Sequence, residues 1–195
     1  MSKQILIIFG HNNYKSGSSF NAAVRDVFIE ESKKNNHKID LLNIYEENRL
    51  KFWDGGKPND QILEYRKRLE HADVMLIMSP CHNYVMNSAT ENFIANVFTP
   101  PWSFSYKKII GNWGYPVPNA LKNKTAIISM TYGGPSFFVS AIIQQIPRRI
   151  KKMVFNGLCG MKVKYLRFYE ILPNMPKEIF EKHMENVRKT VRQLQ

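Results

Sequence analysis

Residues 4–21 read QILIIFGHNNYKSGSSFN and join an apolar run to a polar loop. The run at residues 4–9 is short, rich in β-branched side chains and without alternation, which is typical of a strand buried on both faces of a sheet. Residues 10–20 contain no aliphatic side chain, and an amphipathic helix is predicted directly after them, at residues 20–35. Because the N-terminus of a helix attracts anions, this loop is predicted to hold a phosphate. It carries neither a G-x-G-x-x-G fingerprint nor a Walker motif, and the alternative interpretation is a helix-capping loop.

Strands and helices alternate along the rest of the chain. Apolar runs predict four further strands, at residues 38–44, 73–79, 124–130 and 161–168. Periodicity predicts four further helices, at residues 59–71, 88–98, 136–155 (bent or broken near Pro147) and 176–194. Asn59 or Asp60 is expected to cap the first of these helices, and Ser88 and Glu91 are expected to form a capping box. The alternation predicts an α/β fold with a five-stranded parallel sheet and helices on both faces.

In such a sheet, ligands bind beyond the carboxyl ends of the strands, where the strand order reverses. The loops at residues 10–21, 80–87 and 131–137 follow the first, third and fourth strands, so we expect them to converge. The second loop carries an aromatic ring and polar groups, and the third carries Gly133 and Gly134, which allow a backbone to approach a flat ligand. A phosphate site beside such surfaces indicates a phosphorylated planar ring, and a flavin fits.

The composition narrows the classes of function. A chain of 195 residues and 22.8 kDa is expected to form one domain over residues 1–195. No apolar run approaches the roughly 20 residues that cross a bilayer, so we expect a cytoplasmic protein without membrane insertion. The net charge is +12, but the basic clusters lack a recognisable aromatic motif or a basic tail, and no nucleic-acid partner is expected. Cys81 and Cys159 are expected to be reduced thiols, because no disulfide or zinc spacing is present.

The segment at residues 99–122 reads TPPWSFSYKKIIGNWGYPVPNALK and is rich in proline and aromatic residues. It shows little periodicity. A stretch of this length without regular structure is unusual inside a compact domain, so we expect it to have a function.

Five stretches in this order resemble the flavodoxin-like NAD(P)H:quinone oxidoreductases and their bacterial relatives. They are GHNNYKSGSSFNAAV (10–24), LLNIYEENRL (41–50), SPCHNYVMNSATENFIANVFTPPWSFSY (79–106), TYGGPSFF (131–138) and GLCGMKVKYLRFY (157–169). The resemblance implies a flavodoxin-like doubly wound sheet with strand order 2-1-3-4-5. It also implies a homodimer in which residues 99–116 face the partner. Asn87 departs from the pattern, since relatives usually carry proline there.

The resemblance also implies site residues and cofactors. The flavin, FMN or FAD, would be held at its phosphate and ribityl chain by His11, Ser18, Ser19, Phe20 and Asn21. One edge of its ring would be lined by Pro80, Cys81, His82, Asn83 and Tyr84, and the other part by Thr131, Tyr132, Gly133 and Gly134. Tyr132 and His82 are the candidates for catalytic side chains, and no metal is expected.

The implied activity is a two-electron, ping-pong transfer of hydride from NADH or NADPH to a quinone or similar small molecule. The alternative is a flavin-binding ancillary subunit that regulates a potassium-efflux transporter with little turnover. Steady-state NAD(P)H oxidation with a quinone would separate the two.

Overall fold

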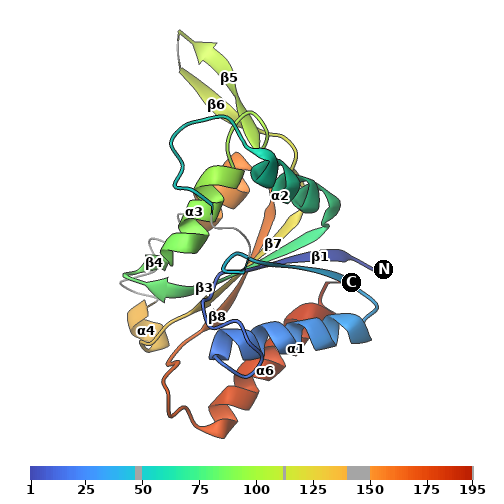
Figure 1. Ribbon diagram of the computed structural model, residues 1–195, viewed down its shortest axis with the longest axis vertical. Coiled ribbons are helices and arrows are strands. Elements are labelled where there is room, and N and C mark those ends of the chain that lie inside the picture. Colours follow the sequence, from blue (N-terminus) through green and yellow to red (C-terminus); the bar gives the residue numbers. More distant parts are fainter. Residues whose placement is uncertain (47–49, 112, 140–149, 195) are drawn as a thin grey trace.

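The central sheet runs through the middle of the protein, whose computed structural model describes residues 1–46, 50–111, 113–139 and 150–194 (Figure 1). Its parallel strands lie in the order β2-β1-β3-β7-β8, which confirms the expected order. They are β1 (Gln4–Phe9), β2 (Lys38–Asn43), β3 (Val74–His82), β7 (Thr125–Thr131) and β8 (Lys162–Phe168). A short strand, β4 (Val85–Met86), pairs antiparallel with the end of β3.

Helices cover both faces of this sheet. Figure 1 shows α1 (Phe20–Lys34) and α6 (Lys177–Arg192) together on one face, and α2 (Asp60–His71) and α3 (Ser88–Val97) on the other. Each face has its own hydrophobic core: Ile7 of β1 packs in the core with α1 and α6, whereas Leu6 and Ile8 pack in the core with α2 and α3. Because both faces are packed, the strand sequence is apolar without alternation.

Side-chain caps start α2 and α3. Asn59, one of the two residues predicted for this cap, is the N-cap of α2. Its Oδ1 accepts a hydrogen bond from the Ile62 N–H at 2.9 Å. The predicted capping box of Ser88 and Glu91 is wrong. Asn87 is the N-cap of α3, because its backbone is extended (φ −62°, ψ 158°) and its Oδ1 accepts from the Thr90 N–H.

The segment at residues 99–122, in which we expected little regular structure, contains an antiparallel pair of strands, β5 (Phe104–Ile110) and β6 (Trp113–Pro118). Phe104 anchors its base and is buried, whereas the side chains farther out are mostly exposed on both faces. The pair projects from the body of the molecule in Figure 1. With no face packed on a core, these strands lack the alternation that marks a half-buried strand.

The predicted helix at residues 136–155 is described only in part. The structure shows a short helix, α4 (Ser136–Phe138), and a π-helical segment at Ile150–Leu158. Residues 140–149, including the expected bend at Pro147, lie outside the described residues. In the described part of the chain, no helix is both long and apolar enough to cross a membrane.

Candidate functional site

A tight turn joins β3 to β4 beyond the carboxyl ends of the parallel strands. His82 pairs with Val85, so only Asn83 and Tyr84 form the loop between the strands. Both have positive φ angles, 48° and 68°, which is the conformation of a type I′ hairpin turn. Because non-glycine residues rarely adopt this conformation, two in succession mark a turn that the surrounding fold must hold in place.

A cavity of about 350 Å³ lies between this turn and the loop that follows β7. It brings together six of the predicted site residues: Cys81, Asn83, Tyr84, Tyr132, Gly133 and Gly134. A Cβ placed on Gly133 would meet no atom within 4 Å, so the backbone there borders open space. The cavity is therefore bounded by an exposed stretch of backbone and by the Asn83–Tyr84 turn.

The loop after β7 is tied to the segment that follows β8. Tyr132 donates its N–H to the carbonyl of Phe168 (2.8 Å) and accepts from the N–H of Ile171 (3.0 Å). Its ring stacks on Tyr169, with 5.5 Å between ring centroids and 19° between planes. The Tyr132 hydroxyl is buried against the Met130 sulfur, and burial raises the pKa of this phenol well above its usual range. Tyr132 therefore stays protonated at physiological pH.

The first loop ends in the N-cap of α1. Ser19 Oγ accepts a hydrogen bond from the Ala22 N–H (3.1 Å) and donates to the Asn13 carbonyl (2.9 Å). Ser18 Oγ donates to the Lys15 carbonyl. Both predicted serines thus stabilise the loop itself. The amides available to an anion are those of Phe20 and Asn21, because a helix cannot pair its first N–H groups internally.

Asn21 connects the first loop with the third. Its Nδ2 donates to Thr131 Oγ1 at 3.2 Å, and the residue is only 4% exposed. Its Oδ1 is also buried, with no hydrogen-bond partner among the described residues. Since buried polar atoms are nearly always paired, this oxygen indicates a missing donor at the site.

The two histidines of the predicted site lie in the first and second loops. His11 Nδ1 accepts a hydrogen bond from the Asn13 N–H at 3.0 Å. Burial lowers the pKa of His11, and the charge of neighbouring His82 lowers it further. His11 is therefore neutral near pH 7, and its Nε2 carries the proton, because Nδ1 is an acceptor. His82 does not line the cavity, unlike Cys81 beside it, because successive strand side chains point to opposite faces.

The ring of Phe20 packs away from the cavity. It contacts Phe168, Phe180 and His183 edge to face, with centroid distances of 5.2, 5.9 and 5.7 Å. Phe168 and Phe180 belong to the core between α1, β8 and α6, and His183 lies on α6. The ring of Phe20 therefore contributes to the core, and its backbone N–H is the group that faces the start of the helix.

Sequence reasoning missed Asn87 as a site residue. Its Nδ2 donates to the carbonyl of Gly10, and its N–H donates to Ser79 Oγ at 3.0 Å. Its side chain also caps α3, so this one residue, through its side chain and its backbone N–H, joins the ends of β1 and β3 to the start of a helix. The signal for it was present, because asparagine is a preferred N-cap residue, but the S-x-x-E motif placed the cap one position later.

Comparison with known proteins identifies a matching family and solved structures with a similar fold. A family model described as "Flavodoxin-like fold" matches residues 3–191. The structure of Smu.1420 from Streptococcus mutans UA159 superimposes with a TM-score of 0.81 and 24% identity, covering 98% of this chain and 100% of that one. An NAD(P)H:quinone oxidoreductase from Methanothermobacter marburgensis gives a TM-score of 0.82 with 16% identity over 100% of both chains. An FMN-dependent NADH-azoreductase from Bacillus anthracis, crystallised with FMN, gives 0.77 with 19% identity over 100% of this chain and 99% of that one. No curated protein matches the sequence.

Proposed function

The chain belongs to the family with the flavodoxin-like fold, and on that premise we propose that it is a flavin-dependent NAD(P)H oxidoreductase that reduces a quinone or a similar acceptor. The observation that carries the proposal is the 350 Å³ cavity between the second and third loops. The Asn21 side chain joins the first loop to Thr131, and its buried oxygen has no hydrogen-bond partner among the described residues. Two of the structurally similar proteins are named as an NAD(P)H:quinone oxidoreductase and an FMN-dependent azoreductase. We also propose that residues 1–195 form a single flavin-binding domain.

The residues present fit a flavin. The first amides of α1, at Phe20 and Asn21, would bind its phosphate, because a helix N-terminus attracts anions. The Asn21 oxygen would accept a hydrogen bond from a ribityl hydroxyl, and His11 could donate one through Nε2. The open backbone at Gly133 and Gly134 would face the ring.

A bound flavin supplies hydride acceptance from a nicotinamide and its delivery to an acceptor. The chain's residues would position the reactants and set the local polarity. Backbone N–H groups of Gly133 and Gly134 would stabilise negative charge near the ring, as preorganised donors do in other active sites. The ring of Tyr84 would shield one side of the cavity from water. Tyr132, buried and protonated, would act as a rigid wall rather than as a base.

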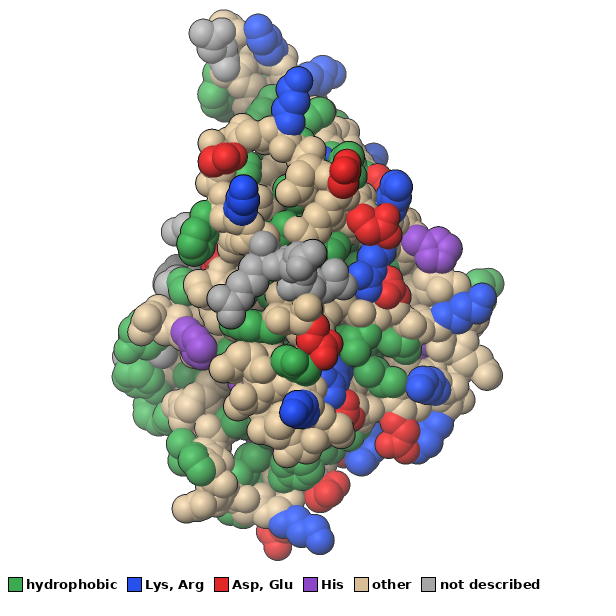
Figure 2. Space-filling model, in the orientation of Figure 1, with side chains coloured by type: hydrophobic (Ala, Val, Ile, Leu, Met, Phe, Trp, Pro, Cys, Tyr) green, Lys and Arg blue, Asp and Glu red, His purple; other side chains and the backbone are tan. Residues whose placement is uncertain are grey.

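One open cavity would serve both substrates in turn, which favours ping-pong kinetics. The net charge of +12 would attract an anionic nicotinamide dinucleotide. Figure 2 shows Lys and Arg side chains scattered over the face in view rather than gathered in one patch. This distribution supports general electrostatic attraction and does not distinguish NADH from NADPH.

The proposal also includes a homodimer formed through the β5–β6 pair. Large apolar side chains on this pair are exposed, among them Tyr106 at 63%, Ile110 at 76% and Trp113 at 67%. Exposed apolar patches of this kind mark interaction surfaces in many proteins. A second copy of the chain is the partner that we propose for it.

The decisive experiment is a visible absorption spectrum of the purified protein, with mass analysis of the compound released by heat. We expect flavin absorbance, or saturable uptake of FMN or FAD when the protein is purified empty. Steady-state oxidation of NADH and NADPH with a quinone then tests the activity. Flavin-loaded protein with negligible turnover would contradict the enzymatic proposal and favour the regulatory alternative, an ancillary subunit of a potassium-efflux transporter.

A further inference from the structure

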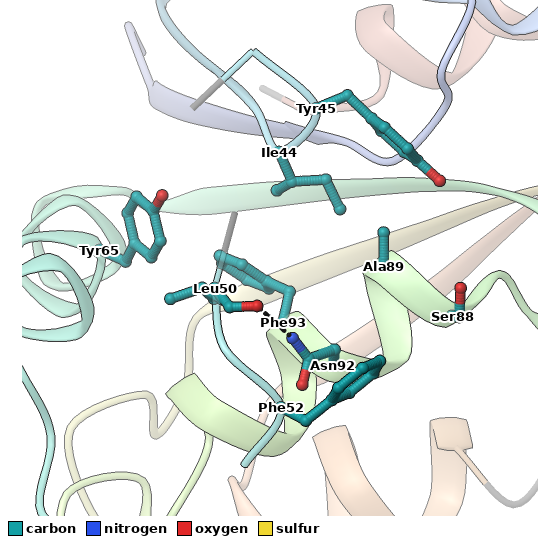
Figure 3. A pocket seen from close by; sticks show the side chains of 9 residues that line it. All are labelled: Ile44, Tyr45, Leu50, Phe52, Tyr65, Ser88, Ala89, Asn92 and Phe93. Atoms are coloured by element: carbon teal, nitrogen blue, oxygen red, sulfur yellow. Dashed lines mark hydrogen bonds between the residues drawn. The ribbon is translucent and has the colours of Figure 1, made fainter. Parts of the chain in front are cut away.

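A second cavity, of about 290 Å³, lies between the end of β2, the segment Leu50–Phe52 and the helices α2 and α3 (Figure 3). None of the residues that line it lines the 350 Å³ cavity. It has no part in the function proposed above.

Two asparagines of α3 fix the segment that closes one side of this cavity. Asn92 Nδ2 donates to the carbonyl oxygens of Leu50 (3.1 Å) and Lys51 (3.2 Å), and Asn96 Nδ2 donates to the same Lys51 carbonyl at 3.2 Å. Figure 3 shows the bond from Asn92 to Leu50 with the Phe52 ring beside it. Because these bonds connect segments at least 41 residues apart, the wall is a product of the tertiary fold.

The cavity is lined by apolar and aromatic side chains together with the hydroxyls of Tyr45 and Ser88 and the amide of Asn92. Ile44 and Ala89 point toward each other across the space in Figure 3, and the hydroxyls of Tyr45 and Ser88 lie apart from each other on the same side of the view. None of the described residues that line the cavity is charged. An ionic ligand would lose hydration without gaining a charged partner from these described residues, so they favour a neutral ligand.

The size and the rings restrict the ligand further. Ligand sites commonly occupy about 300–1,000 Å³, and this cavity of about 290 Å³ lies just below that range, so it suits only a small molecule of one or two rings. Phe52 and Phe93 border the space, and aromatic side chains favour offset or edge-to-face contacts with another ring. Phe52 is 82% exposed, so a bound ring would cover apolar surface that now faces water.

We propose that this cavity binds a small neutral aromatic alcohol or ketone of one or two rings. The ring would contact Phe52 and Phe93, and its oxygen would hydrogen bond to Tyr45 or Ser88. The inference does not depend on flavin binding, because it uses a different cavity.

The test is a calorimetric titration of the purified full-length chain with 2-naphthol. We expect saturable binding that Ala89→Leu weakens by at least about tenfold, because the larger side chain fills the cavity. Ala95→Leu is the matched control, since Ala95 is exposed on the same helix and does not line the cavity. Thermal unfolding of both variants checks that they are folded.

A second pair of variants tests the cavity at exposed positions, where a substitution leaves the packing of the core unchanged. Phe52→Ala should weaken naphthol binding severalfold, whereas Trp53→Ala, next to it and outside the cavity lining, should leave the affinity unchanged. The titration is repeated with excess riboflavin, and we expect the same affinity. Absence of saturable binding, equal affinity in all four variants, or displacement of naphthol by riboflavin would each overturn the proposal.

Discussion

The side-chain amide of Asn87 donates a hydrogen bond to the backbone carbonyl of Gly10, 77 residues earlier in the chain. The other end of the same amide accepts from the Thr90 N–H and Thr90 Oγ1, at 3.0 and 2.8 Å. A Cβ on Gly10 would collide with the Thr90 side chain, so glycine is required for this close approach. One buried amide thus holds together the first loop, the second loop and the start of α3.

Replacing Asn87 with alanine is expected to destabilise the protein by about 2–4 kcal/mol, because α3 loses its cap and the Gly10 carbonyl is left buried without a partner. The matched control is Asn59→Ala, which removes only the cap of α2 at an exposed position and should cost about 1 kcal/mol. Urea unfolding measures both. Equal losses in the two variants would show that the bond to Gly10 contributes nothing.

A methyl group at Gly133 is expected to weaken flavin binding without destabilising the fold. The added Cβ would meet no protein atom within 4 Å and would project into open space at the cavity. We expect Gly133→Ala to raise the dissociation constant for FMN about tenfold or more. Gly134→Ala should have a smaller effect, because its Cβ would rest against Val139 at 3.5 Å. Fluorescence titration with FMN compares them, and equal affinities would argue against a flavin ring beside Gly133.

Acid is expected to destabilise the fold through His37. Its Nδ1 accepts a hydrogen bond from the Lys3 N–H at 3.2 Å, and burial lowers the pKa of the imidazole. The unfolded chain then binds a proton more readily than the folded one. The contribution of His37 to the free energy of unfolding should therefore be constant above the unfolded-state pKa of about 6.5, fall as the pH drops from there to the folded-state pKa, and level off below it.

Urea unfolding at a series of pH values measures this slope. Burial lowers the pKa of His11 and His183 as well, so they add to the effect with the same sign. His37→Asn should reduce the slope, whereas His71→Asn, at an exposed position on α2, should leave it unchanged. An identical slope in both variants would remove His37 from the explanation.

Charge placed on the β5–β6 pair is expected to separate the proposed dimer. Ile110 and Trp113 are register partners near the tip and are among the most exposed large apolar residues. Light scattering should show a dimer for the original chain and a monomer for Ile110→Lys combined with Trp113→Ser. Leu63→Lys, an exposed position on α2, is the control and should remain dimeric. A monomeric original chain would refute the proposed assembly.

The parallel strands could be predicted because burial on both faces leaves long apolar runs. Ile7 and Ile8 pack in different cores, and both positions are therefore apolar in the sequence. The β5–β6 pair could not be predicted in this way, because side chains such as Ile110 are exposed and impose no pattern. Local signals also compete: Asn87 and Ser88 are both good N-cap residues, and only the bond to Gly10 decides between them.

The position of the candidate site in the fold could be predicted from the sequence, but the directions and burial of its side chains could not. Parallel topology alone brings the three loops together beyond the carboxyl ends of the strands. The direction of the Phe20 ring depends on Phe168 and Phe180, and the burial of Tyr132 depends on Tyr169. These partners lie far along the chain, and nothing in the local sequence indicates them.

The alternation of β1 between two cores has a consequence for how the molecule comes apart. Residues next to each other in this strand are anchored on opposite sides of the sheet, so neither layer of helices can detach without exposing a surface that the other layer needs intact. The two layers are therefore expected to unfold in a single cooperative transition, and a destabilising substitution in either core should lower the unfolding temperature of both layers together.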